Sequence, residues 1–121
     1  MSRLARICWV VTIVYWCGLF GVTHLPAPRL PVIPVTDKTA HAFTYCLLAI
    51  GLFCSFYFSK RRRASDVAIL VLGIMLAYGA IDEWTQIPVG RSCELADWFA
   101  DAAGSGVAVV VCTIVSSLFG A

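Results

Sequence analysis

The sequence predicts an all-α integral membrane protein: a single domain, residues 1–121, built as a bundle of four transmembrane helices. Its composition is the first reason, because 60% of the 121 residues are hydrophobic and only 13% are charged, about half the charged share of a soluble domain. Mean hydropathy is +0.87, more apolar surface than so short a chain can bury in its own interior. The second reason is four continuous apolar stretches, each near the roughly 20 residues that span about 30 Å of hydrocarbon. A water-soluble domain, a disordered chain and a membrane barrel with alternating polarity are excluded.

The stretches place the spans near residues 7–25, 39–59, 66–87 and 95–119. The first follows Arg3 and Arg6, as a signal peptide would. It is longer than the usual apolar region and no small-residue cleavage site follows, so we expect a retained anchor.

Turn-forming residues separate the predicted spans. Pro26, Pro28, Pro31 and Pro34 disfavour helix after the first span and predict an extended connection. Pro88 and Gly90 are expected to end the third helix before the fourth begins.

The orientation follows from lysine and arginine counted by connection. The N-terminus and residues 60–63 hold six of them, and the other two connections hold three. The positive-inside rule therefore predicts that both termini are cytoplasmic. A net charge of +2 gives no reason to expect a nucleic-acid partner.

With this topology, most acidic residues gather at the outer face. These are Asp37, Asp82, Glu83, Glu94, Asp97 and Asp101. Spacings of three and four place polar residues on one face of each of three helices. The stripes are Lys38, His41 and Tyr45 in the second span, Tyr78, Asp82 and Gln86 in the third with Glu83 beside them, and Asp97, Asp101 and Gly104 in the fourth.

Charged groups facing lipid cost about 2.5 to 3.5 kcal/mol each at the membrane centre. These side chains should therefore face inward and pair with each other or with Arg91. An ion-pair network that only fixes helix packing is one interpretation, and a functional site is the other.

Three segments carry a family resemblance: DKTAHAFTY at 37–45, YGAIDEWTQIPVGR at 78–91 and DWFADAAG at 97–104. Together they resemble the signature segments of the VanZ-like membrane proteins, whose namesake is associated with resistance to the glycopeptide teicoplanin. The resemblance implies a multi-pass protein of the bacterial inner membrane with a role in the cell envelope. Relatives often carry asparagine where this chain has Asp101, which implies hydrogen bonding there rather than a required charge.

The first functional hypothesis is acid-base chemistry on a lipid-linked or cell-wall precursor. His41 would act as the acid or base, with Asp82 or Glu83 orienting its ring. Substrate contacts are predicted for Lys38, Tyr45, Gln86, Arg91, Asp97 and Asp101, with Arg91 and Lys38 holding a phosphate or carboxylate.

The alternative is a non-catalytic module that binds an envelope lipid or a glycopeptide antibiotic and gives low-level resistance. In that case Arg91, Lys38 and the interfacial Trp84 and Trp98 would make the contacts. A proton-coupled transporter is disfavoured because residues 7–23 hold no carboxylate.

Residues of metal-ligand type are His41, Asp82, Glu83 and Asp97, but no HExxH spacing fixes a geometry. We therefore expect no cofactor and a hydrogen bond from His41 to Asp82, with a divalent metal ion bound by these residues as the alternative. All six cysteines are predicted to be free thiols, because five fall within spans and Cys93 has no partner. Ala100, Gly104 and Ala108 should bring the fourth helix close to a neighbour.

Overall fold

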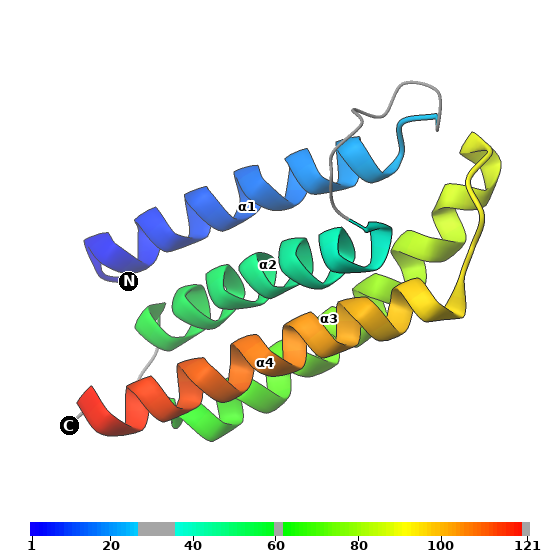
Figure 1. Ribbon diagram of the computed structural model, residues 1–121. Helices are drawn as coiled ribbons and strands as arrows, with labels where there is room; N and C mark the ends of the chain where they lie inside the picture. Colours follow the sequence, from blue (N-terminus) through cyan, green and yellow to red (C-terminus); the bar gives the residue numbers. More distant parts are fainter. Residues whose placement is uncertain (27–35, 60–61, 120–121) are drawn as a thin grey trace.

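The computed structural model describes residues 1–26, 36–59 and 62–119, and these form four α-helices packed as a bundle (Figure 1). The helices are α1 (Arg3–Thr23), α2 (Asp37–Ser59), α3 (Ala64–Gln86) and α4 (Leu95–Phe119), with a short 3-10 turn η2 (Ile87–Val89) after α3. All four are long and apolar enough to cross a membrane. The predicted all-α fold of four spans is confirmed.

The helix boundaries lie within four residues of the predicted spans. α1 begins earlier than expected because the Ser2 hydroxyl accepts a hydrogen bond from the Ala5 amide at 3.1 Å and so caps the helix. α3 ends as predicted: Pro88 lies in η2, and Gly90 has φ of 80°, a conformation that glycine adopts without strain. The predicted extended connection at Pro28, Pro31 and Pro34 lies outside the described residues.

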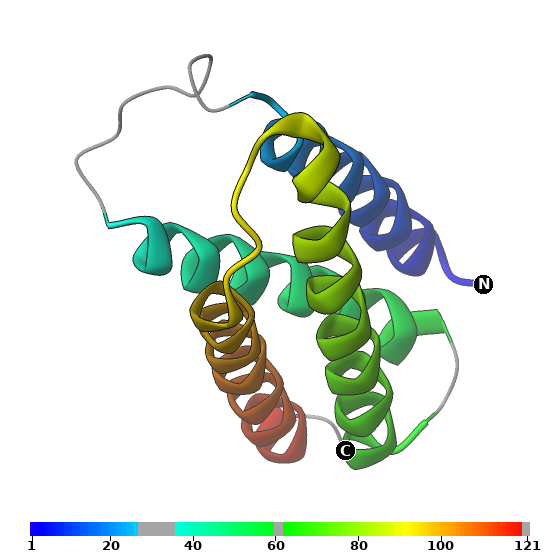
Figure 2. The ribbon, with the colours of Figure 1, turned by 90° about the vertical axis from the view of Figure 1, so that its right-hand side faces the viewer.

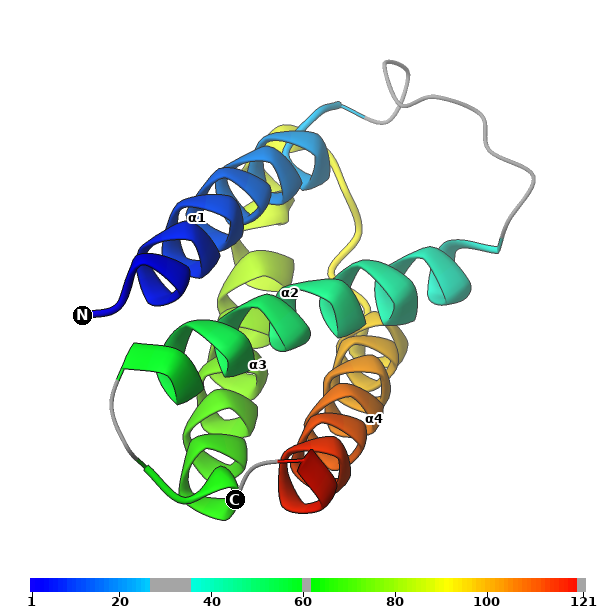
Figure 3. The ribbon, with the colours of Figure 1, turned by 90° about the vertical axis from the view of Figure 1, so that its left-hand side faces the viewer.

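α2 is the central helix of the bundle. It packs against the other three, most extensively against α4, whereas α1 packs mainly on α2 and α3 packs on α4 (Figure 3). The close approach of α2 and α4 depends on Gly104, because a Cβ at this position would overlap the carbonyl oxygen of Ala42. Ala108, one turn further along α4, is also buried. The predicted packing of the small-residue stripe is thus confirmed at these two positions.

Polar contacts attach α1 to α2 along the length of the membrane span. The Trp9 indole donates to the Ser59 hydroxyl at 2.8 Å, and the Thr12 and Ser55 hydroxyls lie 3.1 Å apart. Nearer the C-terminal end of α1, the Tyr15 hydroxyl donates to the carbonyl of Thr44 at 3.0 Å. Hydrogen bonds of this kind hold helices together where lipid offers no competing partner.

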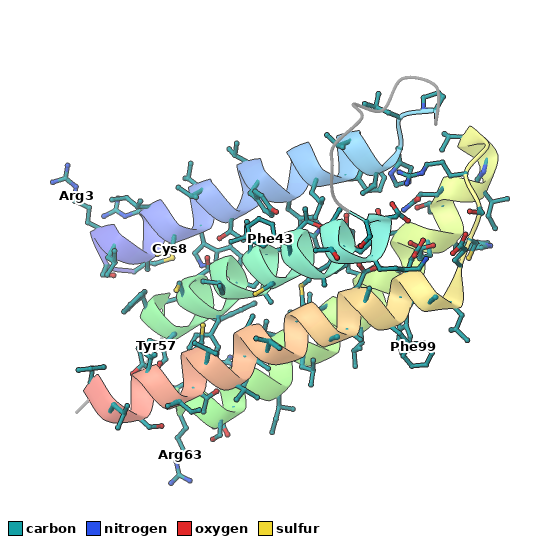
Figure 4. The ribbon with its side chains drawn as sticks, in the orientation of Figure 1. Arg3, Cys8, Phe43, Tyr57, Arg63 and Phe99 are labelled. Carbon is teal, nitrogen blue, oxygen red and sulfur yellow. The ribbon has the colours of Figure 1, made fainter. Side chains whose placement is uncertain are left out.

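The two ends of the bundle differ in polarity. The N-terminus and the last turn of α4 lie at one end with Arg3 and Arg63 (Figures 1 and 4). The apolar core includes Phe53 from the C-terminal half of α2 and Val71 from the N-terminal half of α3, the halves nearer that end. The opposite end gathers the C-terminal turns of α1 and α3 and the N-terminal turns of α2 and α4. Which end faces the cytoplasm stays a prediction of the positive-inside rule.

Candidate functional site

A cluster of buried polar side chains occupies the end of the bundle away from the termini, and Figure 2 looks onto this end. All four helices contribute to it, whereas the spacing of polar residues within single helices indicated only α2, α3 and α4. Its buried members are Thr23 from α1, His41 and Tyr45 from α2, Asp82, Glu83 and Gln86 from α3, and Asp97 and Asp101 from α4.

His41 lies between carboxylates on both sides of its ring. Its Nδ1 is 2.8 Å from Asp101 Oδ1, a hydrogen bond, and 4.0 Å from Glu83 Oε1. Its Nε2 faces Asp97 Oδ2 at 3.9 Å and Asp37 Oδ2 at 4.0 Å. The expected hydrogen bond from His41 to Asp82 is therefore wrong, because Asp101 takes that place.

The reason lies in the packing of α4. Gly104 lets α4 approach the α2 backbone at Ala42, next to His41 in the chain. Asp101 precedes Gly104 by three residues and shares its face, so its carboxylate meets the imidazole. An asparagine at this position would still offer an oxygen to an Nδ1–H, which agrees with the hydrogen-bonding role implied above.

Asp82 is the centre of a separate hydrogen-bond network. It is fully buried, and it accepts hydrogen bonds from the hydroxyls of Thr23, Tyr45 and Tyr78 at 3.0, 3.0 and 3.3 Å and from the Gln86 amide at 3.0 Å. These donors come from α1, α2 and α3, so the carboxylate ties three helices together. Tyr45 and Gln86, predicted to contact substrate, have their polar groups bonded to Asp82. The interpretation of the polar residues as a network that fixes helix packing therefore applies to the surroundings of Asp82.

Glu83 is buried with one oxygen used and one free. Its Oε2 accepts a hydrogen bond from the Glu94 backbone amide at 3.1 Å. Its Oε1 has no hydrogen-bond partner among the described residues, and the same is true of Asp101 Oδ2 and Ser105 Oγ. Native proteins leave few buried polar atoms unpaired, and such atoms call for an explanation.

The two predicted anion-binding cations are already engaged. Lys38 forms ion pairs with Glu94, at 2.8 Å, and with Asp97. The hydrogen bond from Lys38 holds the pKa of the Glu94 carboxyl below its usual range. Arg91 does not pair with an acid of the described part of the chain, contrary to expectation, and instead its Nη1 donates to the carbonyl of Thr23 at 2.8 Å. It thereby satisfies a carbonyl at the C-terminus of α1.

An open groove between α3 and α4 reaches Glu83 from outside the bundle. It has a volume of about 420 Å³ and is lined by Ala80, Glu83, Cys93, Glu94, Leu95 and Trp98. Its walls are mainly apolar, and the Trp98 indole is fixed by a 3.0 Å hydrogen bond to the Leu76 carbonyl. Phe99, which follows Trp98 in the chain, points away from α4 (Figure 4). Trp84 on α3 is 70% exposed. The groove thus combines an apolar wall with a buried carboxylate.

Sequence reasoning missed several of these residues. Thr23 donates to Asp82, but a threonine at a helix end carries no pattern that marks it. Ala80 and Leu95 line the groove only because α3 and α4 pack side by side, which spacing within one helix does not reveal. The six cysteines are free thiols, as predicted.

Within the described ranges, two groups of side chains have the spacing to hold a metal ion. His41, Glu83 and Asp101 form a fully buried group, and Asp37, His41 and Asp97 form a partly exposed one. In each group the ligand atoms lie within 4.8 Å of one another. Asp82, expected among the ligands, belongs to neither group.

Fold and cluster together define a multi-pass membrane protein with a buried, predominantly acidic polar site at one end of the bundle. Neither a family model nor a solved structure matches the chain. The chain is similar to an uncharacterized protein of the fission yeast Schizosaccharomyces pombe, with 36% identity over 86 residues. The match covers 70% of this chain and 51% of the yeast protein, so the chain spans about half the length of that relative.

Proposed function

We propose that this protein is a VanZ-like membrane protein that acts by acid-base chemistry on a lipid-linked or other envelope molecule. The observation that carries the proposal is the groove between α3 and α4, whose apolar walls end at the buried carboxylate of Glu83. A lipid needs this combination, because its chain stays in an apolar environment while its polar group meets a reactive one.

His41 and Glu83 are the proposed acid-base pair. Glu83 lines the groove, and its Oε1 atom, which has no hydrogen-bond partner among the described residues, is buried 4.0 Å from His41 Nδ1. A small rotation of the Glu83 side chain would present a carboxylate backed by an imidazole to a substrate hydroxyl or water in the groove. Asp101 orients the ring through its 2.8 Å contact. Asp82 supports the site through helix packing and takes no part in the chemistry.

The non-catalytic alternative is a module that holds a lipid or glycopeptide antibiotic in the same groove. The exposed Trp84 and the apolar wall at Leu95 and Trp98 favour it. Lys38 and Arg91 contribute less than that alternative needs, because both are bonded to protein groups. In either case the partners are the bilayer and one lipid-like molecule.

For the cell, we propose a multi-pass protein of the bacterial inner membrane, with the site at the outer face and a role in teicoplanin resistance. This follows from the family resemblance and from the positive-inside rule. The fungal relative favours, within the same proposal, a lipid common to both kinds of cell over a molecule confined to bacterial walls.

Mass analysis of membrane lipids tests the proposal. Lipids are compared between cells that produce the native chain and cells that produce Glu83→Gln or His41→Ala. We expect a covalent change in one lipid class with the native chain and its loss in both variants. Asp66→Asn is the matched control, because Asp66 is an exposed acid at the start of α3, in the other end of the bundle. Identical lipid profiles in all cells would contradict catalysis and favour the non-catalytic alternative. The teicoplanin susceptibility of the same strains then tests that alternative.

A further inference from the structure

Beyond acid-base chemistry, we propose that His41, Glu83 and Asp101 bind a divalent transition-metal ion. The three side chains come from α2, α3 and α4, and these residues are only 7%, 3% and 1% exposed to solvent, respectively. One imidazole and two carboxylates form a donor set that suits Zn²⁺ or Mn²⁺.

The unpaired oxygens are the first argument. Glu83 Oε1 and Asp101 Oδ2 are buried without a hydrogen-bond partner among the described residues. A buried carboxylate oxygen left in this way costs free energy, and a cation between the two carboxylates would remove that cost.

The distances are the second argument. His41 Nδ1 lies 2.8 Å from Asp101 Oδ1 and 4.0 Å from Glu83 Oε1. Ligands of a tetrahedral ion with bonds of about 2.1 Å are about 3.4 Å apart. These two separations fall on both sides of this value, and the ligand atoms of the group all lie within 4.8 Å of one another. Small side-chain rotations that replace the Nδ1–Oδ1 hydrogen bond would bring the three atoms to metal-binding positions.

The surrounding charges are the third argument. Of the four buried carboxylates, only Asp97 has a lysine partner among the described residues, namely Lys38. Glu83 and Asp101 have no lysine or arginine within 4.0 Å in the part of the chain that the structure describes, and His41 alone offers them a proton-dependent charge. A divalent ion would balance this excess of negative charge.

The same geometry selects this group over the alternative one on the other side of the ring. In the group of Asp37, His41 and Asp97, Lys38 already occupies Asp97 and would repel a metal ion, and the side chain of Asp37 is 61% exposed. With a metal on Nδ1, the Nε2–H of His41 would face Asp97 at 3.9 Å, the outer carboxylate that metal-bound histidines commonly have.

A bound cation would also change which substrates the site accepts. The cluster repels an anionic headgroup, whereas a metal ion with an open position attracts phosphate oxygens. This second step rests on the proposed function, and the binding of the metal itself does not.

Metal binding is measured on the full chain, purified in detergent, stripped with EDTA and titrated with Mn²⁺. The free Mn²⁺ signal in electron paramagnetic resonance should fall until one equivalent is bound, and Zn²⁺ should displace the Mn²⁺. Glu83→Gln and Asp101→Asn should each weaken binding by about 100-fold, because each replaces a charged carboxylate ligand by a neutral amide, and loss of even an outer-shell partner costs about 10- to 100-fold. Mn²⁺ is the first probe because cysteine thiols favour Zn²⁺.

Asp37→Asn is the matched control and should bind Mn²⁺ like the native chain. Loss of binding in Asp37→Asn, with retention in Glu83→Gln, would overturn the assignment in favour of the other group. Should the ligand variants fail to fold, the native chain decides: no saturable binding at one equivalent, or no metal-dependent rise in melting temperature, refutes the site. An unchanged lipid profile with metal bound would contradict only the proposed function.

Discussion

Asp82 and His41 are buried at the same end of the bundle but have different kinds of neighbours. Asp82 accepts hydrogen bonds from four side chains and has no unpaired oxygen, so its contacts are those of a structural residue. His41 lies among carboxylates, and two of these, Glu83 and Asp101, each have one oxygen with no hydrogen-bond partner in the part of the chain that the structure describes. The network and the functional interpretation of the polar residues therefore apply to different parts of one cluster.

Replacement of Asp82 by asparagine should destabilise the fold. The new amide group would face one of the donors that now bond to the carboxylate, and a buried donor without an acceptor costs about 1 to 3 kcal/mol. Unfolding of the purified protein, followed by circular dichroism as SDS is added, measures the change. Asp66→Asn, at an exposed position, should unfold like the native chain. Equal stability of the two variants would contradict the structural role of Asp82.

The Lys38–Glu94 pair should give a pH-dependent contribution to stability. Because Lys38 lowers the pKa of Glu94 from 4.5, the pair stabilises the fold above that pH and its contribution is lost as the pH falls through the lower, folded-state pKa. Melting temperatures of the native chain and Glu94→Gln should therefore differ at pH 7 and converge below pH 4.5. The difference should be small, since the pair is solvent-exposed. A difference that persists at low pH would assign another role to Glu94.

The helices themselves could be predicted from the sequence because apolar length and turn residues are local properties. Spacing also identified the correct inward faces: His41 and Tyr45 on α2, Asp82 on α3 and Asp101 on α4 are all buried. The pairing across helices could not be predicted. Spacing fixes neither the rotation of one helix against another nor their separation, and here that separation is set by Gly104 against Ala42. As a result His41 meets Asp101 and not Asp82.

Gly104→Ala tests the importance of this contact. The added methyl group would overlap the backbone carbonyl of Ala42, so α2 and α4 must separate. Overpacking a core typically costs about 1 to 3 kcal/mol of unfolding free energy. We expect a larger loss here, because the clashing atoms belong to the backbone and cannot move aside as a side chain can. The melting temperature of the purified protein measures it.

Gly106→Ala is the control in the same helix, since no atom lies within 4 Å of the added Cβ. It should leave stability unchanged or raise it slightly, as alanine is the better helix former. Equal behaviour of the two variants would show that α2 and α4 are not held at this distance.

The arrangement of all four helices places Cys93 and the polar cluster at one end and Ser65 at the other. If the positive-inside rule applies, an impermeant thiol reagent added to intact bacterial cells labels Cys93, which is exposed. Cys93→Ser should abolish this labelling. In that background, Ser65→Cys should react only after the membrane is opened. The reverse pattern would place the site on the cytoplasmic side.

The position of Lys38 and His41 on α2 has a consequence for biosynthesis. Synthesis proceeds from the N-terminus, so α2 leaves the ribosome before α3 and α4. It carries Lys38, which pairs with buried Asp97, and His41, which contacts Asp101. The most acid-rich helices therefore enter the bilayer when their counter-charges are already there. If circular permutation reversed that order, Asp97 and Asp101 would enter the membrane before Lys38 and His41 and would be transiently unpaired there, which is energetically costly.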